Sequence, residues 1–313
     1  MMKVCMIGLG SIGSRHLKNL FSIAENRGIS LTIDAMRSSK NPLPPKIEDL
    51  VSTVYYSFDD LPEDYDIALI TNPTSMHFET IEHMLPKANH MFIEKPVFDR
   101  VNYDYKSLRW KEDGIYYVAC PLRYHSVIKY LNDFVEQQQI FAIRSICSSY
   151  LPDWRPDDDY RKSYSANSGL GGGVRRDIIH EWDYLLNMFG MPLEVSCQYG
   201  KFSHLDINSE DAAVYTAKYA DKLVSLHLDY FGRHSRREVE LFTSDDVVVG
   251  DLIKKEIRFL NTGKIISLPQ ERDDMQREEI EAFLDMISGN KENCNDINMA
   301  VNTLKIAMGG ECV

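Results

Sequence analysis

The stretch GLGGGVRRDIIHEWDYL, residues 169–185, contains the side chains with the clearest potential for chemistry. If a helix begins after the glycines, Asp177, His180 and Asp183 lie three residues apart and share one face. A carboxylate beside an imidazole fixes the ring tautomer and raises its basicity, which proton transfer requires. A cluster of histidine and carboxylates could also bind a metal, but the chain offers no clear further ligand elsewhere, so no metal site is predicted. A purely structural, partly buried histidine is the alternative.

A second motif lies near the N-terminus, where GLGSIG (8–13) follows the apolar run MKVCMI and opens a helical pattern. In this context G-x-G-x-x-G predicts a dinucleotide-binding loop. The first glycine allows a tight turn, the second lets the backbone approach a pyrophosphate, and the third permits close packing of helix and strand. The expected cofactor contacts are Gly8, Gly10, Ser11, Ile12 and Gly13. Arg15 and His16 fit either the pyrophosphate side or a surface position.

The end of the second predicted strand, IDAMRSSK, bears on the choice of dinucleotide. Asp34 lies inside this strand, whereas Arg37 and Ser38 follow it. A guanidinium binds a phosphate through two hydrogen bonds, so these residues favour NADP(H). In the alternative, Asp34 binds the ribose hydroxyls and the cofactor is NAD(H).

Two further predicted strands end in polar motifs, Asn72-Pro73 and Glu94-Lys95-Pro96. The carboxyl ends of parallel strands form the crevice where ligands bind. An ammonium there can orient a substrate hydroxyl and lower its pKa, as hydride transfer from an alcohol requires. Taken alone, the second motif also fits a surface ion pair before a proline turn.

The predicted elements divide the chain into two regions. Strand and helix patterns alternate over roughly the first 120 residues, which predicts βαβ units and a parallel sheet. Later segments alternate apolar and polar residues between short turns, which favours an antiparallel or mixed sheet. Further helices are expected at 125–138, 174–189 and 275–288. We therefore predict an α/β chain with a doubly wound Rossmann domain (1–121) and an α+β domain (122–313).

The composition excludes several classes of protein. With 35 Lys and Arg against 47 Asp and Glu, the formal net charge of −12 argues against nucleic-acid binding. No apolar stretch is long enough to span a bilayer, and no membrane partner is expected. The cysteines form no C-x-x-C pair, as in a cytoplasmic protein with reduced thiols. They are Cys5, Cys120, Cys147, Cys197, Cys294 and Cys312.

Several ordered segments resemble the Gfo/Idh/MocA family of NAD(P)-dependent oxidoreductases, named after glucose–fructose oxidoreductase and inositol dehydrogenase. They are GSRH (13–16), TNPTSMHFE (71–79), FIEKPV (92–97), PLRYHSVI (121–128) and LGGGVRRDIIHEWDYL (170–185). The segment YLPDWRPDDDYRKSYSANSGLGGG further resembles a branch associated with making sugars for cell-surface polysaccharides.

The resemblance implies roles for individual residues. It places Lys95 at the substrate, as an aid to proton transfer, and makes His180 the acid/base candidate. It places Asn72, Pro73 and Glu94 beside the nicotinamide, and we count His77 and Lys95 among the cofactor contacts as well. Many members form dimers or tetramers through the sheet of the second domain, so a homodimer or homotetramer is expected.

This chain departs from the family pattern at one position. Many members carry an Asp four residues before the histidine, whereas here Arg176 occupies that place and Asp177 follows it. Asp177 remains a catalytic candidate, and Arg176 or Arg175 becomes a candidate contact for an anionic group of the substrate.

The loop before the glycines is the predicted substrate region. Trp154, Tyr160 and Tyr164 lie there among charged residues, and aromatic faces with polar groups suit sugar rings. Arg123 fits either an anionic group of the substrate or a structural salt bridge. The expected substrate contacts are Arg123, Trp154, Tyr160, Tyr164 and Arg176.

Together these features predict an oxidoreductase that transfers a hydride between nicotinamide and a sugar or sugar derivative, nucleotide-linked sugars included. Lys95 and His180 would assist proton transfer. The alternative from another class is a non-catalytic regulator that binds a dinucleotide in the same fold. A further alternative is an enzyme that oxidises its substrate transiently during glycoside cleavage.

Overall fold

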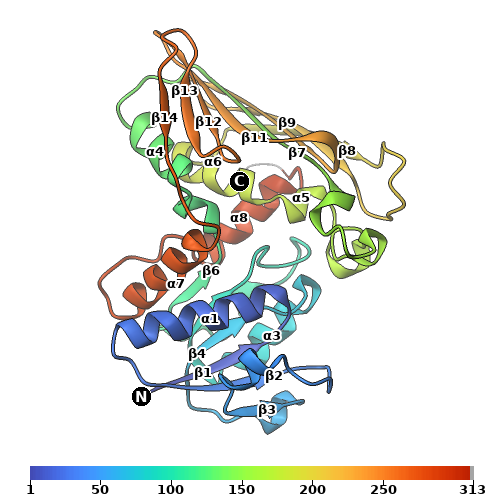
Figure 1. Cartoon of the computed structure of the whole chain (residues 1–313), viewed down its shortest axis with the longest axis vertical. Helices are drawn as coiled ribbons and strands as arrows, with labels where there is room; N and C mark the ends of the chain where they lie inside the picture. The colour runs from blue at the N-terminus through green and yellow to red at the C-terminus, as the bar shows by residue number, and fades with distance from the viewer. Residues whose placement is uncertain (311–313) are drawn as a thin grey trace. The chain divides into compact units, whose positions relative to one another are not determined.

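The computed structural model describes residues 1–310, which form two compact units (Figure 1). Unit 1 comprises Met1–Ala119 and Asp273–Val301, and unit 2 comprises Cys120–Arg272 and residues 302–310. Cys312, one of the six cysteines considered above, lies outside the described residues. The five described cysteines are free thiols.

Unit 1 is built on a six-stranded sheet of order β3-β2-β1-β4-β5-β6 in which every pairing is parallel. The strands are β1 (Met2–Ile7), β2 (Leu31–Met36), β3 (Thr53–Tyr55), β4 (Tyr65–Ile70), β5 (Ala88–Ile93) and β6 (Tyr116–Val118). Central strands are apolar and buried, as parallel strands covered on both faces must be. The strand order reverses between β1 and β4, which creates the switch point where such sheets bind ligands. The predicted Rossmann domain is confirmed.

Helices α1 (Ser11–Asn26) and α7 (Asp274–Ile287) pack against one another in unit 1. The remaining helices of this unit are α2 (Pro45–Glu48), α3 (His77–Met84), η1 (Phe58–Asp60), η2 (Thr74–Met76) and η3 (Tyr105–Ser107). Helix α8 (Ile297–Ala307) spans the division between the units.

Helix α7 does not follow the predicted division of the chain into two domains at residue 121. Residues 273–301 belong to unit 1, although the sequence analysis assigned them to the second domain. Phe283 of α7 packs with its ring centroid 5.6 Å from that of Phe92 in β5. The hydroxyl of Tyr117 donates to the buried Glu279 at 2.9 Å. The apolar face of α7 therefore covers part of the Rossmann sheet.

Unit 2 contains an eight-stranded sheet of order β14-β13-β12-β11-β7-β10-β9-β8. The pairing of β7 with β10 is parallel and the other pairings are antiparallel, which confirms the predicted mixed sheet. The strands are β7 (Ala142–Tyr150), β8 (Glu194–Gly200), β9 (Ala212–Lys218), β10 (Leu223–Asp229), β11 (Phe231–Phe242), β12 (Val247–Asp251), β13 (Glu256–Phe259) and β14 (Ile265–Ser267).

Helices α4 (Ser126–Val135) and α6 (His180–Phe189) lie on one face of this sheet (Figure 1). The rings of Trp182 in α6 and Tyr215 in β9 meet edge to face, and Tyr184 shares a 2.9 Å hydrogen bond with Ser145. The other helices of unit 2 are α5 (Val174–Asp177), η4 (Pro121–Tyr124), η5 (Leu151–Trp154), η6 (Tyr160–Lys162) and η7 (Ser168–Leu170).

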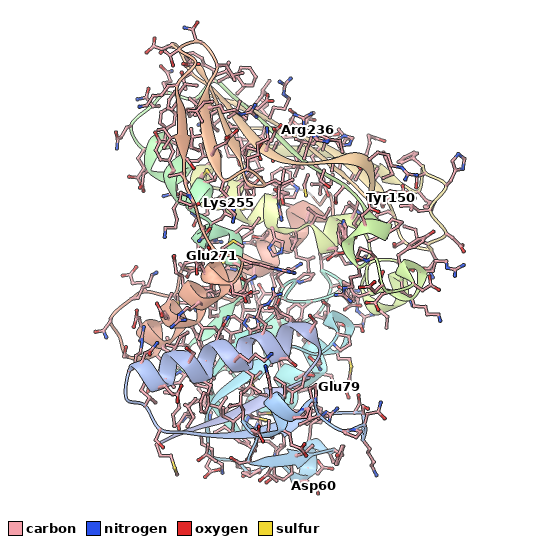
Figure 2. All side chains as sticks on the ribbon, in the orientation of Figure 1. Asp60, Glu79, Tyr150, Arg236, Lys255 and Glu271 are labelled. Atoms are coloured by element: carbon pink, nitrogen blue, oxygen red, sulfur yellow. The ribbon has the colours of Figure 1, made fainter. Side chains whose placement is uncertain are left out.

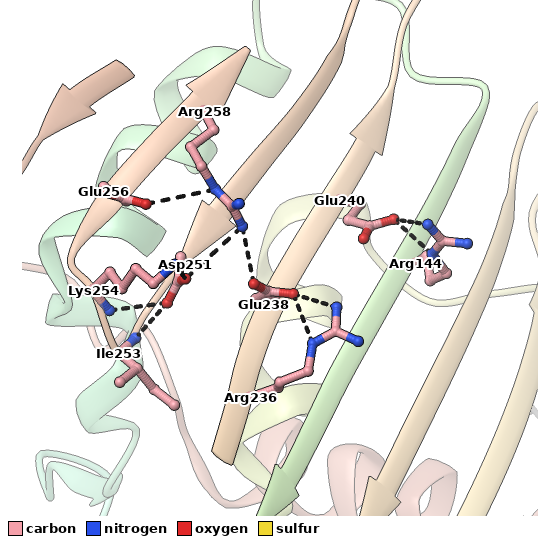
Figure 3. A network of polar contacts seen from close by, with 9 residues as sticks. All are labelled: Arg144, Arg236, Glu238, Glu240, Asp251, Ile253, Lys254, Glu256 and Arg258. Carbon is pink, nitrogen blue, oxygen red and sulfur yellow. Dashed lines mark hydrogen bonds and ion pairs between the residues drawn. The ribbon is translucent and has the colours of Figure 1, made fainter. Parts of the chain in front are cut away.

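The opposite face of this sheet carries a network of ion pairs (Figure 3). Arg144 Nε lies 2.6 Å from Glu240 Oε2, and Glu238 accepts from both Arg236 (3.1 Å) and Arg258 (2.9 Å). Four cations and four carboxylates take part: Arg144, Arg236, Lys254, Arg258, Glu238, Glu240, Asp251 and Glu256. The charges of this network therefore balance within one chain.

The single helix predicted over 174–189 is divided into α5 and α6. Ile178 ends α5 with φ −99° and ψ 30°, outside helical geometry. Ile178 and Ile179 are both buried, and β-branched side chains are stiff in a helix.

Within residues 1–310, no helix is both long enough and apolar enough to cross a bilayer.

The neutral imidazole of His125 caps α4 and makes the stability of unit 2 depend on pH. Its Nδ1 accepts from the N–H of Val127 at 3.2 Å. Burial, reinforced by the charge of Arg237, lowers the pKa of His125 to about 4 from the ordinary 6.5. In the unfolded chain the His125 imidazole takes up a proton near pH 6.5, whereas in the folded chain it stays neutral until about pH 4. The contribution of neutral His125 to the free energy of unfolding is therefore complete above pH 6.5 and is lost as the pH falls towards 4. The full loss is about 3 kcal/mol.

We therefore expect the H125N variant, which keeps an acceptor but does not titrate, to lose less stability than the wild type between pH 7 and pH 4.5. The difference should be about 2 kcal/mol. Urea unfolding of both proteins at the two pH values measures it. Parallel loss of stability in the two proteins would contradict the assignment.

Candidate active site

The predicted dinucleotide loop connects β1 to α1. Gly8 adopts a φ of 86°, and Gly10 precedes the first turn of α1 without a side-chain cap. The first turn carries no acidic side chain, so the positive end of this 16-residue helix is not neutralised locally. A Cβ on Gly10 would meet nothing within 4 Å among the described residues. This open backbone at a helix N-terminus fits the pyrophosphate of a dinucleotide.

Gly13 holds the loop against the end of β4. A Cβ at this position would lie 2.3 Å from Gly8 O and 2.5 Å from Thr71 Oγ1. The hydroxyl of Thr71 itself donates to Gly8 O at 2.6 Å. The three predicted glycines therefore have the geometry that the motif requires, while Ser11 and Ile12 form the first turn of α1.

The end of β2 separates the two candidates for the adenosine ribose. Asp34 is 4% exposed and accepts from the Tyr65 hydroxyl at 2.9 Å, so its carboxylate points into unit 1. Arg37 is half-buried and donates to Asn41 O at 2.9 Å, while Ser38 is exposed. Of these residues, Arg37 and Ser38 are the ones accessible to a ligand.

The turn after β4 places Asn72 and His77 side by side. Asn72 Nδ2 donates to Thr80 Oγ1 at 2.8 Å, while its buried Oδ1 has no partner among the described residues. His77 is 1% exposed, with Nε2 3.0 Å from Asn72 O and Nδ1 3.1 Å from Pro96 O. Burial lowers the pKa of His77. It therefore holds the ends of β4 and β5 together, and its ring has no free edge for a cofactor.

Glu94 connects the end of β5 to the first helix. Its Oε1 lies 2.6 Å from Nε2 of the buried His16, and its Oε2 accepts from the Lys95 N–H at 3.1 Å. Burial raises the pKa of Glu94, but the hydrogen bond from His16 and the charges of His16 and Lys95 lower it by a larger amount. The pKa of Glu94 therefore lies below its usual value. His16 thus lies inside unit 1, and the alternative of a surface position is wrong.

Lys95 follows Glu94 at the carboxyl end of the sheet. The residue is half-buried and is joined to Pro96 by a cis peptide bond. Pro73, the other proline of the two predicted motifs, precedes η2. The two motifs therefore end neighbouring strands, as the sequence predicted.

In unit 2 the three glycines form a tight turn into α5. Gly171 is left-handed with φ 93°, and a Cβ on Gly172 would lie 2.1 Å from Tyr164 O. Asp177, the last residue of α5, accepts through Oδ2 from the Ser165 and Tyr230 hydroxyls, the latter at 3.1 Å. Two hydroxyls thus orient this carboxylate.

The predicted residues Asp177, His180 and Asp183 are divided between two helices. Asp177 ends α5, while His180 begins α6 after the break and lies three residues before Asp183 in the same helix. Asp183 accepts from Arg123 Nε at 3.0 Å and Nη2 at 2.7 Å, and both side chains are 8% exposed. Arg123 therefore forms the structural salt bridge, which is one of the two alternatives that the sequence left open.

A pocket of about 440 Å³ is lined by Asp177 and by the predicted aromatic residues Trp154, Tyr160 and Tyr164. Trp154 is 41% exposed, and its indole N–H donates to Ser149 Oγ at 2.8 Å. The pocket is lined by Leu151, Trp154, Arg155, Asp157, Asp158, Asp159, Tyr160, Lys162, Ser163, Tyr164, Ser165 and Asp177. We call it the Asp177 pocket. Its lining does not include His180 or Arg176, whose Nη1 donates to Gly172 O at 3.0 Å.

Several residues of these sites escaped the sequence analysis. Thr80, Ser165 and Tyr230 orient Asn72 and Asp177 by hydrogen bonds. Tyr230 is 53 residues from its partner, and no local pattern in the sequence reports such a contact. Among residues 1–310, no group of three or more His, Cys, Asp and Glu could hold a metal ion.

Two protein-family models match the chain. Residues 2–105 match "Oxidoreductase family, NAD-binding Rossmann fold", and residues 128–249 match "GFO/IDH/MocA C-terminal domain". Together they span most of the sequence. No curated protein matches the chain.

Solved structures share the fold over almost the whole chain. Myo-inositol 2-dehydrogenase from Lactobacillus plantarum has a TM-score of 0.77 at 21% identity, covering 98% of this chain and 95% of its own. UDP-N-acetylglucosamine 3-dehydrogenase from Acidithiobacillus ferrooxidans has 0.74 at 20%, with the same coverage. Levoglucosan dehydrogenase in complex with NADH and levoglucosan has 0.79 at 14%, again covering 98% and 95%. At these identities the likeness establishes the fold.

The glycine loop generates a paired prediction. The G10A variant should unfold within about 1 kcal/mol of the wild type yet bind dinucleotide weakly, because its new methyl occupies the open space at the helix end. The G13A variant should lose about 1–3 kcal/mol of stability, because its methyl meets backbone and Thr71. Urea unfolding and titration with NADPH and NADH separate the two effects. Equal loss of stability in both variants would contradict this account.

Proposed function

The chain belongs to the Gfo/Idh/MocA oxidoreductase family, and we propose that it transfers a hydride between a nicotinamide cofactor and a CH–OH group of a sugar or sugar derivative. The observation that carries the proposal is the arrangement of unit 1. A glycine loop at a helix N-terminus lies at the switch point of the sheet, and Glu94 and Lys95 end a strand at the same edge.

The residues around the loop fit a dinucleotide. In our proposal the pyrophosphate lies on the N–H groups of Gly10, Ser11 and Ile12, beside the close contact of Gly8 and Gly13. The nicotinamide end lies near Asn72, Pro73 and Glu94. The unpartnered Asn72 Oδ1 is a ready acceptor for a carboxamide N–H. When bound, the cofactor supplies or receives the hydride at C4 of its ring.

Lys95 would orient the reacting oxygen of the substrate. Its ammonium donates to the hydroxyl or carbonyl and stabilises negative charge on that oxygen. The Glu94 carboxylate, kept ionised by His16, holds the Lys95 backbone in place. His180 would exchange the proton of the reacting hydroxyl, as imidazole does near neutral pH.

The Asp177 pocket would hold the sugar. Exposed Trp154 together with Tyr160 and Tyr164 offers aromatic faces, and the oriented Asp177 carboxylate accepts from sugar hydroxyls. The solved relatives support this assignment, because their names include myo-inositol, levoglucosan and a UDP-linked amino sugar. Arg176 does not line the pocket, and we keep it as a proposed contact for an anionic group of the substrate.

We place the protein in the cytoplasm, as a homodimer or homotetramer that uses the sheet of unit 2. The charge network of Figure 3 supports this use, because its balanced ion pairs leave little net repulsion between two such faces. A non-catalytic regulator is the alternative function. It needs neither a lysine at the nicotinamide end nor an acid/base histidine.

Lys95 and His180 should be needed for turnover. We expect K95A and H180A to lower kcat/KM by about 10²–10⁴-fold, the usual contribution of general acid–base groups. The assay follows absorbance of reduced nicotinamide with NADP⁺ or NAD⁺ and a panel of sugars and sugar nucleotides. K18A and H234A, at exposed positions, are matched controls. A wild-type protein that binds cofactor tightly but oxidises none of the panel would favour the regulator.

Arg37 should determine the preference for NADP(H). We expect R37A to weaken NADP(H) binding at least tenfold, because a charge-assisted pair contributes about 1.5–3 kcal/mol. NAD(H) binding should change less than about threefold, since it lacks the 2′-phosphate. Titration of both cofactors measures this, with K46A on α2 as the control. Tighter binding of NAD(H) than NADP(H) by the wild type would overturn the preference.

A further inference from the structure

A second pocket of about 340 Å³ adjoins the Asp177 pocket, and Tyr160 lines both. Its remaining walls come from the end of β7, the connection between β8 and β9, and the start of β11. Tyr150, labelled in Figure 2, is the β7 residue of this lining. The lining is Tyr150, Tyr160, Phe202, Ser203, His204, Leu205, Phe231 and Arg233. We call it the aromatic pocket.

Phe202 is a large apolar side chain that is both exposed and fixed. It is 70% exposed. The N–H groups of Phe202 and Ser203 donate to the buried carboxylate of Asp211 at 2.7 Å and 3.0 Å, and the Ser203 hydroxyl donates to it at 2.6 Å. A Cβ on Gly200 would lie 2.9 Å from Phe202 Cζ, so the ring lies against this glycine. A ring held in place and left exposed is suited to stacking on a ligand.

The aromatic pocket is also cationic. The Arg233 guanidinium carbon lies 3.6 Å from the centroid of the Tyr150 ring, and both Arg233 and His204 are exposed. The lining, within the described residues, contains no carboxylate, although the chain carries a net charge of −12. The Asp177 pocket is the opposite, with four aspartates against Arg155 and Lys162.

This contrast decides where each part of an extended ligand can lie. Phosphate groups are repelled by a cluster of carboxylates and are attracted to a guanidinium, which binds them through paired hydrogen bonds. Neutral sugar hydroxyls instead donate well to aspartates. A nucleobase stacks on an exposed aromatic ring whichever base it is, because every base has a π-face.

From these observations we infer that the aromatic pocket is a subsite for the nucleotide part of a nucleotide-linked sugar. The base stacks on Phe202, the phosphates meet Arg233 and His204, and the sugar passes Tyr160 into the Asp177 pocket. This inference rests on the proposed function, because it assumes that the Asp177 pocket holds the sugar.

The test measures equilibrium binding of uridine diphosphate by calorimetry, with NADPH present at saturation so that the dinucleotide site of unit 1 is filled. We expect the wild type to bind UDP and the variants F202A and R233A each to bind it at least about tenfold more weakly. Uridine, which lacks phosphate, should bind weakly and should respond to F202A but not to R233A. F141A, 45% exposed at the other end of β7, is the control and should bind UDP as the wild type does.

Absence of UDP binding by the folded wild type would overturn the inference, as would equal UDP affinity in the wild type, F202A and R233A. The result is independent of turnover. UDP binding that depends on Phe202 and Arg233, in a protein that oxidises no sugar, would support the subsite and reject the proposed hydride transfer. Oxidation of free sugars by a protein that ignores UDP would do the reverse.

Discussion

The arrangement of unit 1 depends on one partly buried hydrogen bond, between His16 Nε2 and Glu94 Oε1 at 2.6 Å. His16 belongs to α1, whose N-terminus carries the glycine loop, and Glu94 ends β5 immediately before Lys95. Because Glu94 also accepts from the Lys95 N–H, the backbone that carries the lysine is fixed relative to the helix that faces the pyrophosphate. An ionised carboxylate and an imidazole are costly to bury separately, so the pair is stable only when the two elements meet in this way.

In unit 2, two aspartates that lie close in sequence, Asp177 and Asp183, differ in their hydrogen-bond partners. Asp183 is committed to Arg123 in a buried ion pair and stabilises the packing of η4 on α6. Asp177 accepts from the hydroxyls of Ser165 and Tyr230 and lines a pocket. A carboxylate in a pocket wall can meet a ligand, whereas one committed to a buried guanidinium pair does not. The contacts, and not the spacing in the sequence, distinguish the structural aspartate from the candidate functional one.

Local patterns predicted much of this structure. The glycine loop, the polar strand ends and the change from parallel to mixed sheet depend on residues close in sequence, and they were anticipated. The partnership of His16 with Glu94, 78 residues apart, and the return of α7 to unit 1 leave no such pattern. The break at Ile178 was missed because an apolar run of helical period continues through it. Arg123 could not be assigned because a guanidinium suits a substrate anion and an aspartate equally well.

The most direct test of the central claim is the path of the hydride itself. The protein would be incubated with NADP⁺ or NAD⁺ and with sugars and sugar nucleotides deuterated at their ring carbons, and the reduced cofactor would be analysed by mass spectrometry. Our account predicts that deuterium appears at C4 of the nicotinamide. Reduced cofactor without deuterium, or a cofactor that stays oxidised although it is bound, would contradict it.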